Sequence, residues 1–189
     1  MSISDEAFQE AADELGVEVA AIKAVDEVES RGSGFLESGE PKILFEAHIF
    51  SRLTDNQFDR SHPNISSPHW NRNLYKGGQA EHDRLQKAVE LDRKAALKSA
   101  SWGRYQILGL NWDICRHENL QSFINAMYES EKAHLEAFVG FIKSENLNEF
   151  LRNENWNSFA AEYNGPGYKR NQYAQKMKEA FEKYQQFQA

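Results

Sequence analysis

The amino-acid sequence predicts one mainly α-helical domain, with at most a small β-hairpin near residues 35–46. Apolar residues recur three or four positions apart over most of the chain, which is typical of amphipathic helices. Because 40% of the residues are hydrophobic and 12% are aromatic, we expect a packed core rather than a disordered chain. A length of 189 residues fits one domain, so residues 1–189 are expected to form a single unit.

The first two predicted helices have clear ends. Ser4 is a good N-cap for a helix that closes at Gly16. A second helix is expected over about 19–29, and glycines follow it at positions 32 and 34.

The next part of the chain is less regular. The apolar run 41–50 predicts a brief extended segment that leads into a helix reaching about Thr54. The polar stretch 55–78 holds two prolines and a Gly-Gly pair, so we interpret it as a long ordered loop. A loop of this length inside a compact domain is usually functional, and we expect it to border a binding groove.

The remainder is predicted to be helical almost throughout. Ser122 and Asn155 are plausible N-caps for two of these helices. The predicted segments are residues 80–94, 95–99, 105–116, 122–144, 147–151, 155–162 and 170–187.

The composition argues against several classes of protein. With 22 basic and 29 acidic residues the net charge is −7, which argues against binding nucleic acid by bulk electrostatics. No long apolar run occurs, so stable membrane insertion is not expected. The single cysteine, Cys115, rules out a disulfide scaffold and is interpreted as a buried apolar side chain. The six histidines form no HExxH or Cys/His motif, so we expect no metal and no cofactor.

Glu29 is the most informative single residue. It shares a helix face with Ile22 and Val25, where a carboxylate is normally avoided, and it falls in the last turn, where the helix dipole is negative. Both effects penalise the ionised form, and a carboxyl that keeps its proton near neutral pH is what a general acid needs. The alternative is an ordinary surface glutamate at the end of a helix.

Glu46 is the candidate for a second carboxylate. It lies among apolar residues in Ile-Leu-Phe-Glu-Ala-His. Two carboxyls in apolar settings can share a cleft, one as the acid and the other as base or electrostatic partner. The alternatives are a Glu46 satisfied by backbone amides or by an arginine, and a second carboxylate supplied by Glu37 or Glu40.

Two segments combine small residues, aromatic rings and amides. Residues 99–109 are expected to form a loop that leads into a helix, and residues 159–168 to form a helix that ends in a Gly-Pro-Gly turn. Small residues let a polymer approach closely, rings stack on flat ligands such as sugars, and an amide orients them. The alternative for each is ordinary helix-end chemistry with aromatic rings in the core.

Four motifs in chain order resemble the N-acetylmuramidase domain of bacteriophage endolysins, over about residues 19–184. They are Val28-Glu29-Ser30, Ile43-Leu44-Phe45-Glu46-Ala47-His48, Ser101-Trp102-Gly103 through Gln106-Ile107, and Tyr163-Asn164-Gly165-Pro166-Gly167. The segment Leu74-Tyr75-Lys76-Gly77-Gly78 is similar to a loop of that family. More distantly, the pattern is similar to goose-type lysozymes and soluble lytic transglycosylases. Ser38 stands where relatives commonly carry an aspartate, which argues against a mechanism that needs an acid in that turn.

The resemblance implies a lysozyme-like fold, in which a helical lobe and a small lobe with a short β-hairpin flank a substrate groove. It implies cleavage of the β-1,4 bond between N-acetylmuramic acid and N-acetylglucosamine in peptidoglycan, leading to lysis of the bacterial host. Glu29 matches the family's catalytic acid, and Glu46 matches a second acidic position. The positions implied to contact the substrate are Tyr75, Ser101, Gln106, Tyr163 and Asn164.

The resemblance also implies a partner and a place of action. The expected partner is the glycan strand of peptidoglycan, bound by a monomer with no separate cell-wall-binding module. The N-terminal residues show no secretory signal, so we expect synthesis in the host cytoplasm and action on periplasmic peptidoglycan. Export would then need a separate pore-forming protein.

Two alternative functions remain open at this point. A lytic transglycosylase has the same fold and a single glutamate, but the sugar's own 6-hydroxyl replaces water and the products are 1,6-anhydro sugars. A non-catalytic peptidoglycan-binding module would keep the fold without the chemistry.

Overall fold

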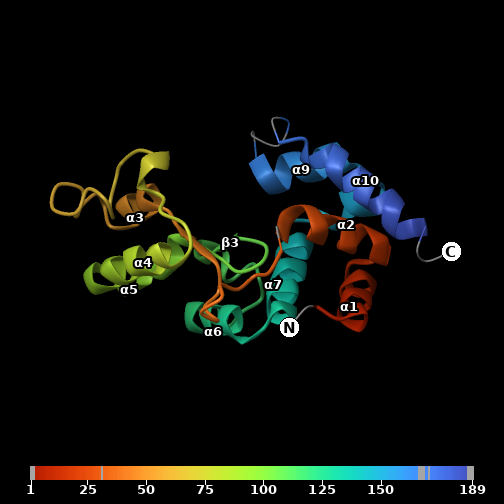
Figure 1. The fold of residues 1–189 in the computed structure, drawn as a ribbon, viewed down its shortest axis with the longest axis horizontal. Coiled ribbons are helices and arrows are strands. Elements are labelled where there is room, and N and C mark those ends of the chain that lie inside the picture. Colours follow the sequence, from red (N-terminus) through yellow and green to blue (C-terminus); the bar gives the residue numbers. More distant parts are fainter. Residues whose placement is uncertain (1–2, 31, 166–168, 170, 187–189) are drawn as a thin grey trace.

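The structure is a computed structural model that describes residues 3–30, 32–165, 169 and 171–186, arranged as two lobes joined by a small sheet (Figure 1). The larger lobe holds α1, α2 and α7–α10, and the smaller lobe holds α3–α5. The elements, with η for 3-10 helices, are α1 (Asp5–Leu15), α2 (Val19–Ser30), β1 (Ile43–Phe45), α3 (Ala47–Leu53), η1 (Arg72–Leu74), α4 (Gln79–Leu91), α5 (Arg93–Lys98), β2 (Ala100–Trp102), β3 (Ile107–Leu108), η2 (Gly109–Asn111), α6 (Leu120–Glu129), α7 (Glu131–Ser144), α8 (Asn148–Arg152), α9 (Trp156–Asn164) and α10 (Tyr173–Gln186). The predicted mainly α-helical class with a small sheet is confirmed.

The larger lobe is built on α2, which packs between α1 and α10. The Ser4 hydroxyl caps α1 by accepting the Ala7 N–H at 3.2 Å, and Gly16 ends the helix in a left-handed conformation (φ 65°), as the sequence predicts. Along α10, Met177 and Phe181 are buried against the core, so the apolar stripe of this helix positions it beside α2. None of the described helices is long and apolar enough to span a membrane.

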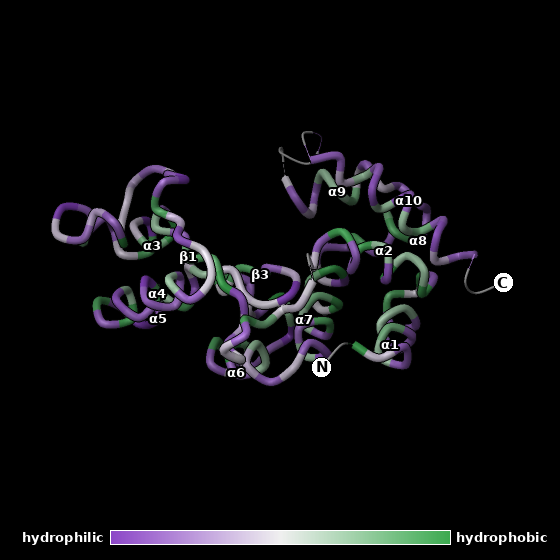
Figure 2. The backbone as a smooth tube through the Cα atoms, viewed as in Figure 1, coloured by the Kyte–Doolittle hydropathy of each residue, from purple (hydrophilic) through white to green (hydrophobic). Residues whose placement is uncertain are grey.

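The smaller lobe is held together by the fully buried Glu81 of α4. Its carboxylate accepts the backbone N–H groups of Phe45 at 3.0 Å, Lys76 at 2.5 Å and Gly77 at 3.1 Å, and it pairs with Arg84 at 2.8 Å. Burial alone would raise the pKa of Glu81, but these donors lower it below its usual value. The long loop between α3 and α4, mostly hydrophilic (Figure 2), is thereby tied to β1.

The sheet differs from the prediction, because its strands come from distant parts of the chain. β1 pairs antiparallel with β2, with Leu44 opposite Ser101, and β2 pairs with β3. Near residues 35–46, where a hairpin was predicted, the structure has an isolated antiparallel bridge between Phe35 and Pro41 and then β1, which pairs with β2 instead of with a neighbouring strand. The predicted helix over 105–116 is wrong throughout. Residues 103–106 form the turn of the β2–β3 hairpin, β3 and the short 3-10 helix η2 follow, and residues 112–116 form turns.

Several helix boundaries also need correction. The predicted helix 122–144 is two helices, because the Ser130 hydroxyl accepts the Ala133 N–H and starts α7. Asn119 is the N-cap of α6, and Ser122 is the third helical residue of its capping box rather than the cap itself. The break between α4 and α5 falls at Asp92, which caps α5. Asn155 is the N-cap of α9 as predicted.

Candidate active site

A cavity of about 730 Å³ lies between the two lobes. Its walls come from the C-terminal end of α2, from β1, from the β2–β3 hairpin, and from the ends of α9 and α10. Five residues that the sequence singles out contribute to this wall: Glu29, Ser101, Gln106, Tyr163 and Asn164. The volume falls within the range of pockets that hold organic ligands, so the cavity is the candidate substrate site.

Glu29 is the only carboxyl group among the described residues that line the cavity. It lies half-buried in the last turn of α2, on the same side as the fully buried Ile22 and Val25. The Asn164 amide nitrogen donates to both Glu29 carboxylate oxygens, at 3.0 Å each. This bridge joins the end of α2 to the end of α9 and orients the carboxyl at the cavity wall.

Tyr163 supports the part of the cavity wall that contains Glu29 and Asn164. Its ring stacks on Phe159, with ring centroids 5.6 Å apart, and its hydroxyl donates to the Tyr105 carbonyl at 3.1 Å. Burial and the nearby Glu29 charge hold the pKa of Tyr163 well above its usual range, so the phenol stays neutral. Because the hydroxyl is already committed to a backbone carbonyl, Tyr163 acts here by holding the β2–β3 hairpin against α9.

Gln106 ends the turn of the β2–β3 hairpin. It has a positive φ of 51°, and its side-chain nitrogen donates to the carbonyls of Gly103 at 2.9 Å and Lys42 at 3.3 Å. These bonds fix the amide plane while the residue stays exposed. Among the described residues no donor reaches the Gln106 amide oxygen, so this oxygen is available to a ligand in the cavity.

Glu46 and Tyr75 lie outside the cavity wall and contact each other instead. The Tyr75 hydroxyl donates to a Glu46 carboxylate oxygen, which His48 Nδ1 approaches at 3.4 Å. Burial and the Glu46 contact raise the pKa of Tyr75. The other acidic candidates, Glu37 and Glu40, are not among the cavity-lining residues either. The sequence-predicted residues therefore form two groups, one around Glu29 and one at the end of β1.

Comparison with known proteins identifies the family. The family model for N-acetylmuramidase matches residues 18–185, nearly the whole chain. The chain belongs to the N-acetylmuramidase family. The crystal structure of a Burkholderia AP3 phage endolysin superimposes with a TM-score of 0.93 at 38% identity, covering 99% of this chain and 72% of that one. No curated protein matches the chain. The predicted lysozyme-like endolysin fold is confirmed, and the family is one of peptidoglycan-cleaving glycosidases.

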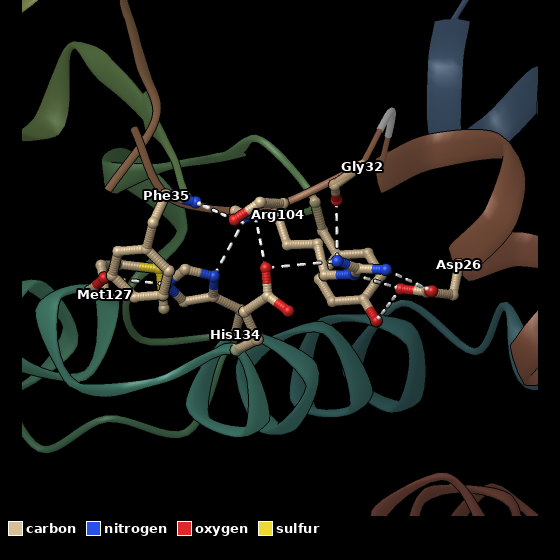
Figure 3. Close-up of polar contacts among 10 residues, drawn as sticks. Asp26, Gly32, Phe35, Arg104, Met127 and His134 are labelled. Atoms are coloured by element: carbon tan, nitrogen blue, oxygen red, sulfur yellow. Dashed lines mark hydrogen bonds and ion pairs between the residues drawn. The ribbon is translucent and has the colours of Figure 1, made fainter. Parts of the chain in front are cut away.

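The site has one feature that the sequence did not predict, an ion-pair cluster around Arg104 (Figure 3). The guanidinium donates to both carboxylate oxygens of Asp26, at 2.6 and 2.7 Å, and to the Gly32 carbonyl at 2.7 Å. It also lies 3.2 Å from the buried carboxylate of Glu131. Asp26 precedes Glu29 by one helical turn, so the Arg104 cluster ties the end of α2 to the hairpin and to α7.

His134 extends the Arg104 cluster into α7. Its Nδ1 accepts the Arg104 backbone N–H at 3.1 Å, so its Nε2 must donate to the Met127 carbonyl at 2.8 Å. Burial lowers the pKa of His134, which agrees with a neutral ring, and Phe35 stacks on it with centroids 4.9 Å apart. The only sequence signal for the Arg104 cluster was an aspartate on a helix rich in apolar residues, which by itself does not name a partner.

Proposed function

We propose that this protein is an endolysin that cleaves the β-1,4 bond between N-acetylmuramic acid and N-acetylglucosamine, with Glu29 as the general acid. The observation that carries the proposal is the position of Glu29 as the single described carboxyl in the wall of the cavity between the lobes. Similarity to a phage endolysin over almost the whole chain supports the same function.

In the proposed reaction, protonated Glu29 gives its proton to the glycosidic oxygen while positive charge develops at the sugar's anomeric carbon. The Asn164 amide holds the carboxyl in the orientation for this transfer. Once ionised, Glu29 can accept a proton from an attacking water, which restores the acid. Glu46 remains the candidate for a second carboxylate that stabilises the positive centre, and its contact with Tyr75 means that it would act from the end of β1.

A lytic transglycosylase is the second candidate, and the cavity gives a specific reason to keep it. This chemistry needs one carboxyl, which first protonates the leaving oxygen and then takes a proton from the sugar's 6-hydroxyl as that oxygen closes onto the anomeric carbon. A cavity wall with one described carboxyl suits such a cycle.

We further propose that the protein is made in the cytoplasm of an infected bacterium and acts on the peptidoglycan glycan strand as a monomer. A separate pore-forming protein would give it access to the wall. The resulting loss of wall integrity would lyse the host.

The test is clearing of permeabilised bacterial cells by the wild-type protein, Glu29→Gln and Glu46→Gln. Loss of a general acid typically lowers the rate by about 10²–10⁴-fold, so Glu29→Gln should fall by about that factor with an unchanged melting curve. A wild-type protein that clears nothing, or a Glu29→Gln variant that clears normally, would overturn the proposal. Glu46→Gln should also be severely slowed, and an unchanged rate removes Glu46 from the mechanism. Mass spectrometry separates reducing-end muramic acid, the product of hydrolysis, from 1,6-anhydro products.

A further inference from the structure

A second cavity, of about 590 Å³, lies between the start of α9 and the start of α10, and the proposed reaction does not use it. Its wall contains Trp156, the first residue of α9, whose side chain is only 5% exposed. The indole nitrogen of Trp156 is buried, and no described residue accepts a hydrogen bond from it. A buried donor without an acceptor costs free energy, so we expect a bound group to supply the acceptor. We call this cavity the Trp156 pocket.

The groups around the indole suit a carboxylate. Lys178 of α10 lines the Trp156 pocket, and its contact with Glu182 at 3.8 Å is weak because the two side chains are 60% and 57% exposed. Its ammonium can therefore turn to a ligand. The start of α9 adds the positive end of a helix dipole, where the Asn155 side chain caps the helix by accepting the Ser158 N–H at 3.2 Å.

The Trp156 pocket also contains groups that would disfavour a simple anion. Glu154 lines it, and this carboxylate would repel an ion such as phosphate but can accept from the N–H groups of a peptide. Asn157 adds an amide that can both donate and accept. The mixture of donors and acceptors therefore favours a peptide that ends in a carboxylate.

The Trp156 pocket adjoins the cavity of the candidate active site. Tyr173 lines that first cavity, whereas its neighbours Gln172 and Ala174 line the Trp156 pocket. Helix α9 links the two as well, because Trp156 begins it and Asn164 at the first cavity ends it, about 12 Å away at 1.5 Å per residue. Figure 1 shows α9 lying beside α10, the two helices that form the Trp156 pocket.

We propose that the Trp156 pocket binds the stem peptide that N-acetylmuramic acid carries, with the terminal carboxylate of the peptide accepting from the Trp156 indole and from Lys178. This inference rests on the proposed function. A stem peptide of four residues spans about 13–14 Å when extended, so a peptide on a muramic acid that lies beside Glu29 can reach the far end of α9. The exposed side chains of Gln172 and Gln175 can move aside to admit it.

The binding test is an NMR titration of the protein with the free stem tetrapeptide L-Ala-γ-D-Glu-meso-diaminopimelyl-D-Ala. The chain has four tryptophans, and the Trp156 indole signal is the one that is missing from Trp156→Phe. We expect this signal to move downfield as the N–H gains an acceptor, while the other three stay in place. The same peptide with an amidated C-terminus should bind at least tenfold more weakly, and acetate at the same concentration should leave the signal unmoved.

The kinetic test compares two substrates with the same glycan, strands that carry stem peptides and strands from which an amidase has removed them. Lys178→Met should raise KM about three- to tenfold for the peptide-bearing strands, with kcat nearly unchanged, and leave the bare strands within twofold. Trp156→Phe, which removes the donor, should shift KM in the same direction. Lys176→Met is the matched control, because Lys176 is exposed on the same helix outside the Trp156 pocket, and it should change neither KM.

Any of three results would overturn peptide binding in the Trp156 pocket. These are a Trp156 signal that does not respond to the free peptide, one that responds equally to acetate, and an effect of Lys178→Met that is absent or equal on the two substrates. Melting curves of each variant show that the fold is intact. A wild-type protein that cleaves neither substrate, while its Trp156 signal still responds to the peptide, refutes the proposed function and not the pocket.

Discussion

Replacing Arg104 with lysine should loosen the end of α2 against the β2–β3 hairpin. The guanidinium uses two nitrogens to hold Asp26 and a third to reach the Gly32 carbonyl. A lysine ammonium keeps the charge but is a compact point donor on a flexible stem, so it cannot hold all three acceptors in one geometry. The substitution therefore separates the geometry of the Arg104 cluster from its charge.

The size of the effect follows from burial and from the bonds that are lost. The Arg104 and Asp26 side chains are only 15% and 10% exposed, so solvent screens the pair little. Loss of two charge-assisted hydrogen bonds at about 1.5 kcal/mol each lowers the free energy of unfolding by about 3 kcal/mol. In a domain of this size each kcal/mol changes Tm by about 2–4 °C, so Tm should fall by about 6–12 °C.

Thermal unfolding followed by circular dichroism measures the stability, and clearing at 25 °C, where both proteins are folded, measures the activity. Arg116→Lys is the matched control, because Arg116 and its partner Glu14 are 46% and 41% exposed and such pairs contribute less than about 1 kcal/mol. Because Asp26 lies one turn before Glu29, Arg104→Lys should also slow clearing by about tenfold, a loss of about 1.4 kcal/mol in transition-state stabilisation. A Tm within 2 °C of wild type would refute the inferred contribution of the Arg104–Asp26 hydrogen bonds to stability. Full activity would refute the link between the Arg104 cluster and Glu29.

Two further predictions concern the core. Because burial lowers the pKa of His134, the unfolded chain binds more protons than the folded one below about pH 6.5, so stability should fall as the pH drops through that range. His134→Gln can still accept from Arg104 and donate to Met127, and it should show a smaller difference in Tm between pH 7.5 and pH 5.5 than the wild-type protein. An unchanged difference would mean that other groups cause the loss of stability at low pH. Gly109→Ala should cost about 3 kcal/mol or more, because a Cβ there would lie 2.1 Å from the Leu97 carbonyl oxygen, and a normal denaturant midpoint would contradict this.

The helix ends that were predicted correctly are those with a local chemical signal. Ser4, Gly16 and Asn155 each cap a helix through groups a few residues away, so the signal lies in a short stretch of sequence. Ser130 has the same chemistry, but it lies within a pattern of helical spacing that continues past it. There the apolar periodicity hides the break between α6 and α7.

The sheet was mispredicted because its register depends on distant pairing. β1 pairs with β2, with Ile43 opposite Trp102, and no feature of residues 35–46 indicates which strand β1 pairs with. The hairpin turn adds a second difficulty, since Gln106 adopts a positive φ that its residue type does not indicate. The segment was correctly singled out for its residue types, but its conformation was not.

In the candidate site, too, single residues could be predicted from the sequence, but the contacts among them could not. Glu29 and Asn164 could each be singled out, from helix face and from motif, but their hydrogen bond joins two helices far apart in sequence. Arg104 and Asp26 are 78 positions apart, and an arginine beside a glycine has no local feature that names its acceptor. Residue types and periodicity thus identify candidates, whereas the contacts among them arise only when the chain closes on itself.

The positions of the buried acids support the proposal that Glu29 is the proton donor. In the smaller lobe the Glu81 carboxylate is neutralised by Arg84 and by backbone donors, and in the larger lobe Asp26 faces Arg104. At Glu81 these donors hold the pKa below its usual value, so this carboxylate stays ionised and is a poor proton donor. Glu29 instead lines the cavity, where the Asn164 amide orients its carboxyl, so among these acids it is the one placed to transfer a proton to a bound sugar.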